Sequence, residues 1–251
     1  THSFEGEFQA FRFSDLQPLN LVKLAELGHN FSHDPIEISS WTSSMSMTEY
    51  VDAVENVRQD IARGWVYQAN LCRVLSAPLE RDLNVVALWN LLSEHNPAPY
   101  LSALQVPAKL SGLANDVRVV SASPELFLSR KTQTLRTSPI KGTARVASEL
   151  LEKDQTENIM IVDLVRNDLG QVCESGSVRV VDLLRIEQHP GLVHLVSDVE
   201  GTLPVGTEWN KIFAALLPPG SVSGAPKSSA LEVIKRLEKS ARGIYCGGFG
   251  W

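Results

Sequence analysis

Residues 148–203 read SELLEKDQTENIMIVDLVRNDLGQVCESGSVRVVDLLRIEQHPGLVHLVSDVEGTL, a long helical segment followed directly by two strands. The helix is predicted from about Ser148 to Cys173, and we expect it to be buried because its apolar residues lie on all sides. The segments Val178–Glu187 and Leu192–Leu203 predict strands. Strands that come in runs, rather than in alternation with helices, predict an α+β fold with antiparallel sheets.

The sequence on either side fits the same fold class. Further strands are predicted over Tyr100–Val106, Val117–Ser121, Glu125–Ser129 and Thr132–Thr137, and from Gly243 onward. Helices are predicted from an N-cap at Thr48 to Gly64, over Leu83–Glu94, over Thr207–Leu217 and over Pro226–Lys239, the last one after a Gly/Ser loop at Pro218–Gly224. Trp65–Leu75 alternates, with Gln68 and Asn70 on one side, which predicts a strand whose polar face meets solvent or a site.

A Ser-rich stretch, Ser39–Ser46, is typical of a linker. We interpret residues 1–45 as the remnant of an N-terminal domain with this linker, and residues 46–251 as the main domain. The chain begins at Thr1 and stops within the apolar run Cys246–Trp251, so we expect a piece of a longer protein, truncated at both ends.

Composition excludes several classes of function. The 251 residues carry 23 basic and 29 acidic side chains, a net charge of −6, which argues against a nucleic-acid partner. No apolar run approaches the ~18 residues of a membrane span, so no membrane association is expected. Three widely spaced cysteines argue against a disulfide framework and fit a reducing, cytoplasmic location.

Two acids in the long helix form the first candidate site. Asp154 and Glu157 are three residues apart and therefore share a helix face. Carboxylates on a buried stripe are costly unless they are paired or bind a cation, and their oxygens suit Mg²⁺. The alternative is an exposed pair near the helix start that only favours the helix dipole.

A second candidate is the loop PPGSVSGAPK at residues 218–227, which leads into a helix. Its free backbone N–H groups, the hydroxyls of Ser221 and Ser223, and Lys227 would form an anion site. The loop lacks the order of a Walker A motif, and an ordinary capped turn is the alternative.

Three single residues are further candidates. Lys141, which follows a predicted strand, is either a solvated surface lysine or a desolvated amine acting as nucleophile or base. Glu125 is either an edge charge or an acid tuned to donate a proton. His194 is either a structural residue of its strand or a site histidine.

Taken together, the segments strongly resemble the chorismate-utilising enzymes from about Trp41 to Trp251. The matching segments are Gly64–Leu71, Ser123–Glu125, Pro139–Thr143, Asp154–Leu169, His194–Ser197, Gly220–Lys227 and Arg242–Gly247. The resemblance implies a fold of two packed antiparallel sheets flanked by helices, as in anthranilate synthase component I, incomplete at the C-terminus. It makes residues 46–251 a truncated chorismate-binding catalytic domain.

The residues at two positions distinguish the reactions that members of this family catalyse. Members that add water to chorismate carry a lysine where this chain has Gln68, which disfavours an isochorismate or salicylate synthase. Anthranilate synthases usually carry alanine at the position of Lys141, whereas lysine marks the component I enzymes that make aminodeoxychorismate for folate synthesis. Anthranilate synthase component I and a non-catalytic paralogue remain the alternatives.

The resemblance also implies roles for the candidate residues. It makes Glu157 a Mg²⁺ ligand, with Asp154 supporting the metal through its water shell. Glu125 would be the general acid and Lys141 the nucleophile that forms a covalent adduct; His194 would be a site histidine, which in anthranilate synthases serves a later elimination. The implied substrate contacts are Gly142, Thr143, Ser223, Lys227 and Tyr245.

The same resemblance implies that ammonia would come from a separate glutamine amidotransferase subunit, and the chain itself shows no cysteine-centred glutaminase motif. The family's chains continue past the position of Trp251 with residues that complete the metal and carboxylate sites. We therefore expect the chain as given to be inactive.

Overall fold

The computed structural model describes residues 40–78, 83–112, 114–248 and 250. These residues divide between two compact units, which are described separately. One unit contains Ser43–Leu75 and Glu125–Gly248, and the other contains Ser76–Pro124. Most of the predicted N-terminal remnant lies outside the described residues, and the predicted boundary between residues 45 and 46 stays a prediction. No helix in the described part of the chain is both long enough and apolar enough to cross a membrane.

The smaller unit is a helix on a hairpin. The strands β4 (Tyr100–Val106) and β5 (Val117–Ser123) pair antiparallel with Tyr100 opposite Ser123, and α3 (Val85–His95) packs against both. The short helix α4 (Ala108–Ser111) lies in the connection between them. Asn84 caps α3 by accepting from the backbone N–H groups of Val86 and Ala87, so this helix begins two residues after the predicted start.

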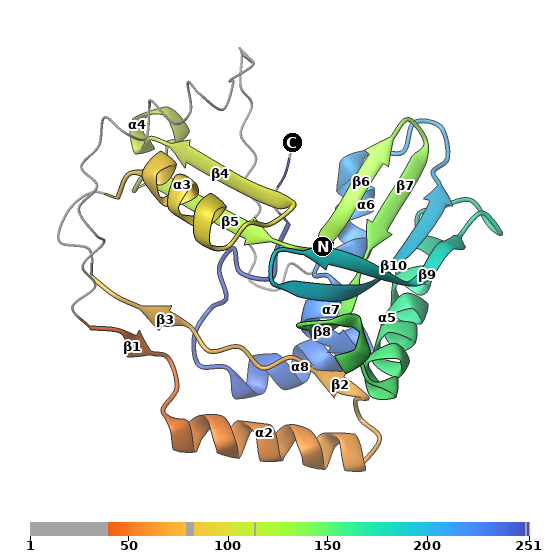
Figure 1. Ribbon diagram of the computed structural model, residues 1–251, viewed down its shortest axis with the longest axis horizontal. Coiled ribbons are helices and arrows are strands. Elements are labelled where there is room, and N and C mark those ends of the chain that lie inside the picture. Colours follow the sequence, from red (N-terminus) through yellow and green to blue (C-terminus); the bar gives the residue numbers. More distant parts are fainter. Residues whose placement is uncertain (1–39, 79–82, 113, 249, 251) are drawn as a thin grey trace. The chain divides into compact units, whose positions relative to one another are not determined.

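The larger unit is built on a five-stranded antiparallel sheet (Figure 1). Its strands are β6 (Leu126–Lys131), β7 (Thr134–Ser138), β8 (Ile140–Ala144), β9 (Arg179–His189) and β10 (Leu192–Thr202). The long strand β10 pairs with β9 along one edge, and with β7 and β8 in succession along the other. The predicted α+β class with antiparallel sheets is confirmed. β8 itself was not predicted, because Ile140-Lys141-Gly142 shows no alternation.

The helix α5 (Glu152–Gly170), preceded by one 3₁₀ turn, η1 (Ala147–Glu149), packs on this sheet. Its inner face joins a core with β7, β10 and α6 (Trp209–Leu216); the fully buried members are Leu135, Ile161, Leu169, Val199, Leu203 and Ile212. The prediction of burial all round was wrong, because Ile159 is 44% exposed: only one stripe of the helix meets the sheet.

A second core cluster joins two further helices. Val57 of α2 (Met47–Ala62) and Val66 pack with Ala230 and Val233 of α8 (Lys227–Leu237). The N-cap of α2 is Ser46 and not the predicted Thr48, because the Ser46 hydroxyl accepts from the Glu49 backbone while the Glu49 carboxylate accepts from the Ser46 N–H.

Three local predictions were wrong. The segment Trp65–Leu75 forms only β2 (Gln68–Ala69) and β3 (Leu75–Ser76); β2 pairs with β11 (Gly224–Ala225), and β3 with β1 (Thr42–Ser43). The Gly/Ser loop contains one helical turn, α7 (Gly220–Ser223). The predicted strand after Gly243 is a pair of turns instead, since Gly243 and Cys246 adopt positive φ and the Tyr245 N–H donates to Arg242.

Candidate active site

The side chain of Lys141 is the centre of the candidate site. It extends from β8, is 15% exposed, and its Nζ donates to the carbonyl oxygen of Ser221 at 3.0 Å. The same Nζ lies 3.5 Å from Oε1 of Glu157 on α5. Lys141 is therefore held between the sheet, α5 and α7, and it is not a fully solvated surface lysine.

Glu125 joins this cluster through Ser221. The Ser221 hydroxyl donates to Glu125 Oε1 at 2.6 Å, and the Ile140 backbone N–H donates to Oε2 at 3.2 Å. Burial raises the pKa of the Glu125 carboxyl, against the opposing effects of these two hydrogen bonds and of Lys141. A carboxyl group that resists ionisation is suited to carry a proton to a leaving group. Ser221 contacts both Glu125 and Lys141, and the sequence offered it only as part of an anion loop.

Two polar residues of the segment around β2 complete the surroundings of Lys141. Gln68 Nε2 donates to Glu157 Oε1 at 3.2 Å, and Asn70 Nδ2 donates to the Ser221 carbonyl at 2.9 Å. The polar face predicted here therefore meets the site, although the strand itself is short. Gln68 Oε1 is buried with no hydrogen-bond partner among the described residues. A buried acceptor of this kind needs a donor from water or a ligand.

The acids Asp154 and Glu157 differ in their surroundings. Asp154 Oδ2 accepts from the Leu151 N–H at 2.8 Å and so closes the first turn of α5, as the dipole alternative predicts. Gly142 lies against it: a Cβ atom on Gly142 would be 2.9 Å from the Asp154 Cβ. Glu157 is 41% exposed and faces Lys141.

Carboxylate oxygens are the donors that Mg²⁺ prefers, so the chemistry of this pair fits the expected ion. Among the described residues, however, no group of three or more His, Cys, Asp or Glu side chains lies close enough together to hold a metal. Water or substrate oxygens would have to supply the remaining ligands, as is usual for Mg²⁺.

His194 lies on β10, directly opposite Thr143 of β8. Thr143 Oγ1 and His194 Nδ1 are 2.9 Å apart and hydrogen-bonded. Burial lowers the pKa of the His194 ring, and the neighbouring His189 acts in the same direction. His194 is therefore an uncharged ring at neutral pH, able to accept or donate a proton.

The other predicted substrate contacts have different neighbours. Lys227 Nζ lies 2.6 Å from Asp168 Oδ2 and near the Leu216 carbonyl, and the Ser223 hydroxyl donates to the Pro219 carbonyl at 2.8 Å. Tyr245 is 61% exposed and lines a cavity of about 480 Å³ with Arg242 and Cys246. As substrate contacts, Lys227, Ser223 and Tyr245 stay predictions.

Comparison of the sequence with known proteins finds relatives of this chain. The family description "chorismate binding enzyme" matches residues 17–251. Aminodeoxychorismate synthase component 1 of Bacillus subtilis (strain 168) is 35% identical over 252 residues, 96% of this chain and 51% of that protein. "Anthranilate synthase component 1 1" of Haloarcula marismortui is 36% identical over 262 residues, 98% of this chain and 52% of that protein.

Comparison of the structure with solved structures finds a protein of the same kind. The crystal structure of anthranilate synthase component I from Streptococcus pneumoniae TIGR4 superposes with a TM-score of 0.71 at 30% identity, over 89% of this chain and 51% of that one. The chain spans about half the length of the curated relatives it matches.

Proposed function

Because the chain belongs to the family of chorismate binding enzymes, we propose that it carries catalytic residues of an aminodeoxychorismate synthase component I. Such an enzyme converts chorismate and ammonia to 4-amino-4-deoxychorismate for the synthesis of para-aminobenzoate and folate. The observation that supports this most is the sheltered Lys141 amine beside Glu157 and the Ser221–Glu125 pair. This cluster of side chains contains both a nucleophile, Lys141, and an acid, Glu125.

In the first step, Lys141, after its ammonium group has lost a proton to solvent, forms a bond from its nitrogen to C2 of chorismate while the C4–oxygen bond breaks. Glu125, whose protonated form is favoured because burial raises its pKa, gives its proton to the departing hydroxyl, which leaves as water. The Ser221 hydroxyl holds the Glu125 carboxyl in place. The products of this step are a lysine adduct and a Glu125 carboxylate.

In the second step, ammonia forms a bond to C4 and the bond between C2 and the Lys141 nitrogen breaks. The electron pair returns to the lysine amine, and the new ammonium group at C4 returns one proton to Glu125. Dividing one displacement into two steps is the usual benefit of covalent catalysis. Thr143 and His194 lie on the neighbouring strands, where they would bind and orient the substrate.

Glu157 and Asp154 would hold Mg²⁺, which supplies positive charge for a chorismate carboxylate when it is bound. To bind the ion through Oε1, Glu157 would have to release Lys141 and Gln68, since both contact that oxygen. We further propose that the ammonia is delivered by a glutamine amidotransferase subunit and that the enzyme acts in the cytoplasm.

Anthranilate synthase component I is the second candidate, because relatives with that name are as similar as those named aminodeoxychorismate synthase. The product separates the two, since anthranilate formation releases pyruvate and amination at C4 alone does not. A non-catalytic paralogue is the third reading, which the intact set of Glu125, Lys141, Glu157 and His194 disfavours.

The test is to incubate the purified protein with chorismate, Mg²⁺ and ammonium and to identify products by mass spectrometry. Both this chain and the product of the complete reading frame that encodes it should be assayed. Aminodeoxychorismate without pyruvate supports the proposal. Anthranilate with pyruvate contradicts it, and no product from either protein favours the non-catalytic paralogue.

A further inference from the structure

Beside His194, strand β9 carries charged residues that have no part in the steps above. Register places His194 directly opposite Glu187 on β9 and opposite Thr143 on β8. Directly opposite residues of antiparallel strands project on the same face of the sheet. Glu187, His194 and Thr143 therefore form one row across three strands.

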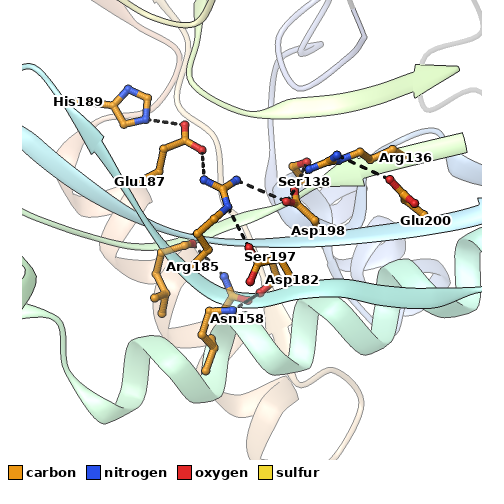
Figure 2. Close-up of polar contacts among 12 residues, drawn as sticks. Arg136, Ser138, Asn158, Asp182, Arg185, Glu187, His189, Ser197, Asp198 and Glu200 are labelled. Carbon is orange, nitrogen blue, oxygen red and sulfur yellow. Dashed lines mark hydrogen bonds and ion pairs between the residues drawn. The ribbon is translucent and has the colours of Figure 1, made fainter. Parts of the chain in front are cut away.

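The carboxylate of Glu187 makes its contacts with other residues of β9. Arg185 donates to Glu187 Oε2 at 2.7 Å, and His189 Nε2 lies 2.9 Å from Oε1 (Figure 2). Within the described part of the chain, no hydrogen bond joins Glu187 to His194. The acid opposite His194 is thus already held by two partners.

A wider network fixes these partners. Arg185 also reaches Asp198 Oδ2 at 3.5 Å, and Asp198, which is 2% exposed, accepts from Ser138 at 2.5 Å and from Arg136 at 2.6 Å. Figure 2 shows these side chains in a continuous line from Arg136 to His189. Glu187 is therefore not free to turn toward His194.

His189 completes the contact with the site. Its ring centroid lies 4.7 Å from that of His194 at an interplanar angle of 64°, an edge-to-face arrangement. Two protonated rings at this distance would repel each other. Burial and this neighbouring ring both disfavour a charge on His194.

We propose that His189 and Glu187 are positioning residues that set the orientation and the charge state of His194. The proposal rests on the proposed function in taking His194 as an active-site residue. Thr143 engages Nδ1, and no described residue hydrogen-bonds Nε2, so Nε2 is the atom that would meet the substrate. An uncharged ring with one free nitrogen can exchange a proton there.

The other charged groups nearby are directed elsewhere. From β8, Lys141 contacts Glu157 and Ser221. From α5, Asp154 caps its own helix, and Glu157 meets Lys141 and Gln68. Along β10, Asp198 is engaged by Arg136 and Arg185. Of the described groups, His189 and Glu187 are thus the ones whose substitution should shift the pKa of His194. His189 lowers this pKa and Glu187 raises it, so the two substitutions should act in opposite directions.

The test is an NMR titration of the histidine Cε1 signals in the free protein, without chorismate. The sequence has six histidines, and the His194 signal is identified by its loss in His194→Gln. His189→Phe keeps a ring against His194 but removes the imidazole nitrogens, so that Glu187 loses its partner at Oε1 and keeps Arg185 at Oε2. The His194 midpoint should then rise by several tenths of a pH unit or more. Adding Glu187→Gln to this variant should bring the midpoint back down.

His95→Phe changes another histidine of the described chain, on α3, and is the matched control; it should leave the midpoint in place. A His194 midpoint that stays or falls in His189→Phe overturns the proposal. If the double variant has the same His194 midpoint as His189→Phe alone, the role proposed for Glu187 is overturned. If His189→Phe loses its far-UV circular dichroism signal, His189→Gln takes its place. The titration needs no turnover, so an inactive protein that shows these shifts contradicts the proposed function alone.

Discussion

Nζ of Lys141 and Oε1 of Glu157 lie 3.5 Å apart, so the proposed nucleophile and the proposed metal ligand share one ion pair. The same carboxylate oxygen accepts a hydrogen bond from Gln68. A cation that binds Oε1 must displace both contacts, and one that binds Oε2 still meets the opposing charge of the Lys141 ion pair. Metal binding and the freedom of the lysine amine are therefore coupled through a single carboxylate.

This coupling predicts that Lys141→Ala binds Mg²⁺ more tightly than the parent protein. A partly exposed ion pair contributes ~0.2–1 kcal/mol, so its removal should raise the affinity of the Glu157 site by a factor of about one and a half to five. Isothermal titration calorimetry with MgCl₂ measures the change. Lys141→Arg keeps the charge and serves as the control; equal affinities in all three proteins would show that Glu157 is not the metal ligand.

Glu125→Gln should lower the activity of the protein while raising its thermal stability. Loss of a general acid should slow turnover by ~10²–10⁴-fold. Because burial raises the pKa of Glu125 in the folded protein, this carboxyl lowers the free energy of unfolding at pH values above the pKa of the unfolded chain, and it does so in full above the raised pKa. The variant should therefore melt at a higher temperature than the parent at pH 8.

The gain in melting temperature should shrink as the pH falls and disappear below about pH 4, where the glutamate is protonated in both the folded and unfolded states. Thermal melts across this range provide the check. A variant that melts lower than the parent at pH 8 would show that the hydrogen bonds from Ser221 and Ile140 outweigh the desolvation of the carboxylate.

Lys227→Met should destabilise the fold whatever the role of Lys227 in binding. Its partner Asp168 is 5% exposed, and burial raises the pKa of this carboxyl while Lys227 opposes the rise. Leaving a buried charge without its partner costs ~3–5 kcal/mol. Urea unfolding should show this loss, and adding Asp168→Asn should recover part of it; full stability of Lys227→Met would contradict the placement of this ion pair.

Asn158→Ala should loosen α5 from the sheet. Asn158 is fully buried, donates to the Leu195 carbonyl at 3.0 Å and accepts from the Ser197 hydroxyl at 2.5 Å. Removing it leaves buried polar groups without partners, at ~1–3 kcal/mol each. The exposed Asn167→Ala on the same helix is the control, and equal unfolding free energies for the two variants would refute this role.

Local patterns predicted much of this fold. Tyr100–Val106 is a strand with the predicted bounds, and β9, β10 and α5 lie within a few residues of theirs. Each of these segments is rich enough in apolar residues to be predicted as an element by itself. β8 has none, and Gly142 adopts a φ of +89°, so this strand depends on β10 to pair with it.

The candidate site could be predicted from the sequence less completely than the fold. Lys141, Glu125, Glu157 and His194 came from residue type and resemblance, whereas Ser221, Gln68 and Asn70 joined them only in three dimensions. Their convergence depends on pairing between segments far apart in the chain, as with Tyr67 and Ala225. No local periodicity encodes such contacts, and the ion pair of Lys227 with Asp168 was missed for the same reason.

The central claim is that the Lys141 amine bonds covalently to chorismate. The product of the complete reading frame should be incubated with chorismate and Mg²⁺ without ammonia, digested, and its Lys141 peptide weighed by mass spectrometry. The account predicts a peptide heavier by chorismate less one water, absent in Lys141→Ala and lost when ammonium is added and aminodeoxychorismate is released. An unmodified Lys141 peptide from a preparation that makes aminodeoxychorismate, with Lys141→Ala equally active, would contradict it.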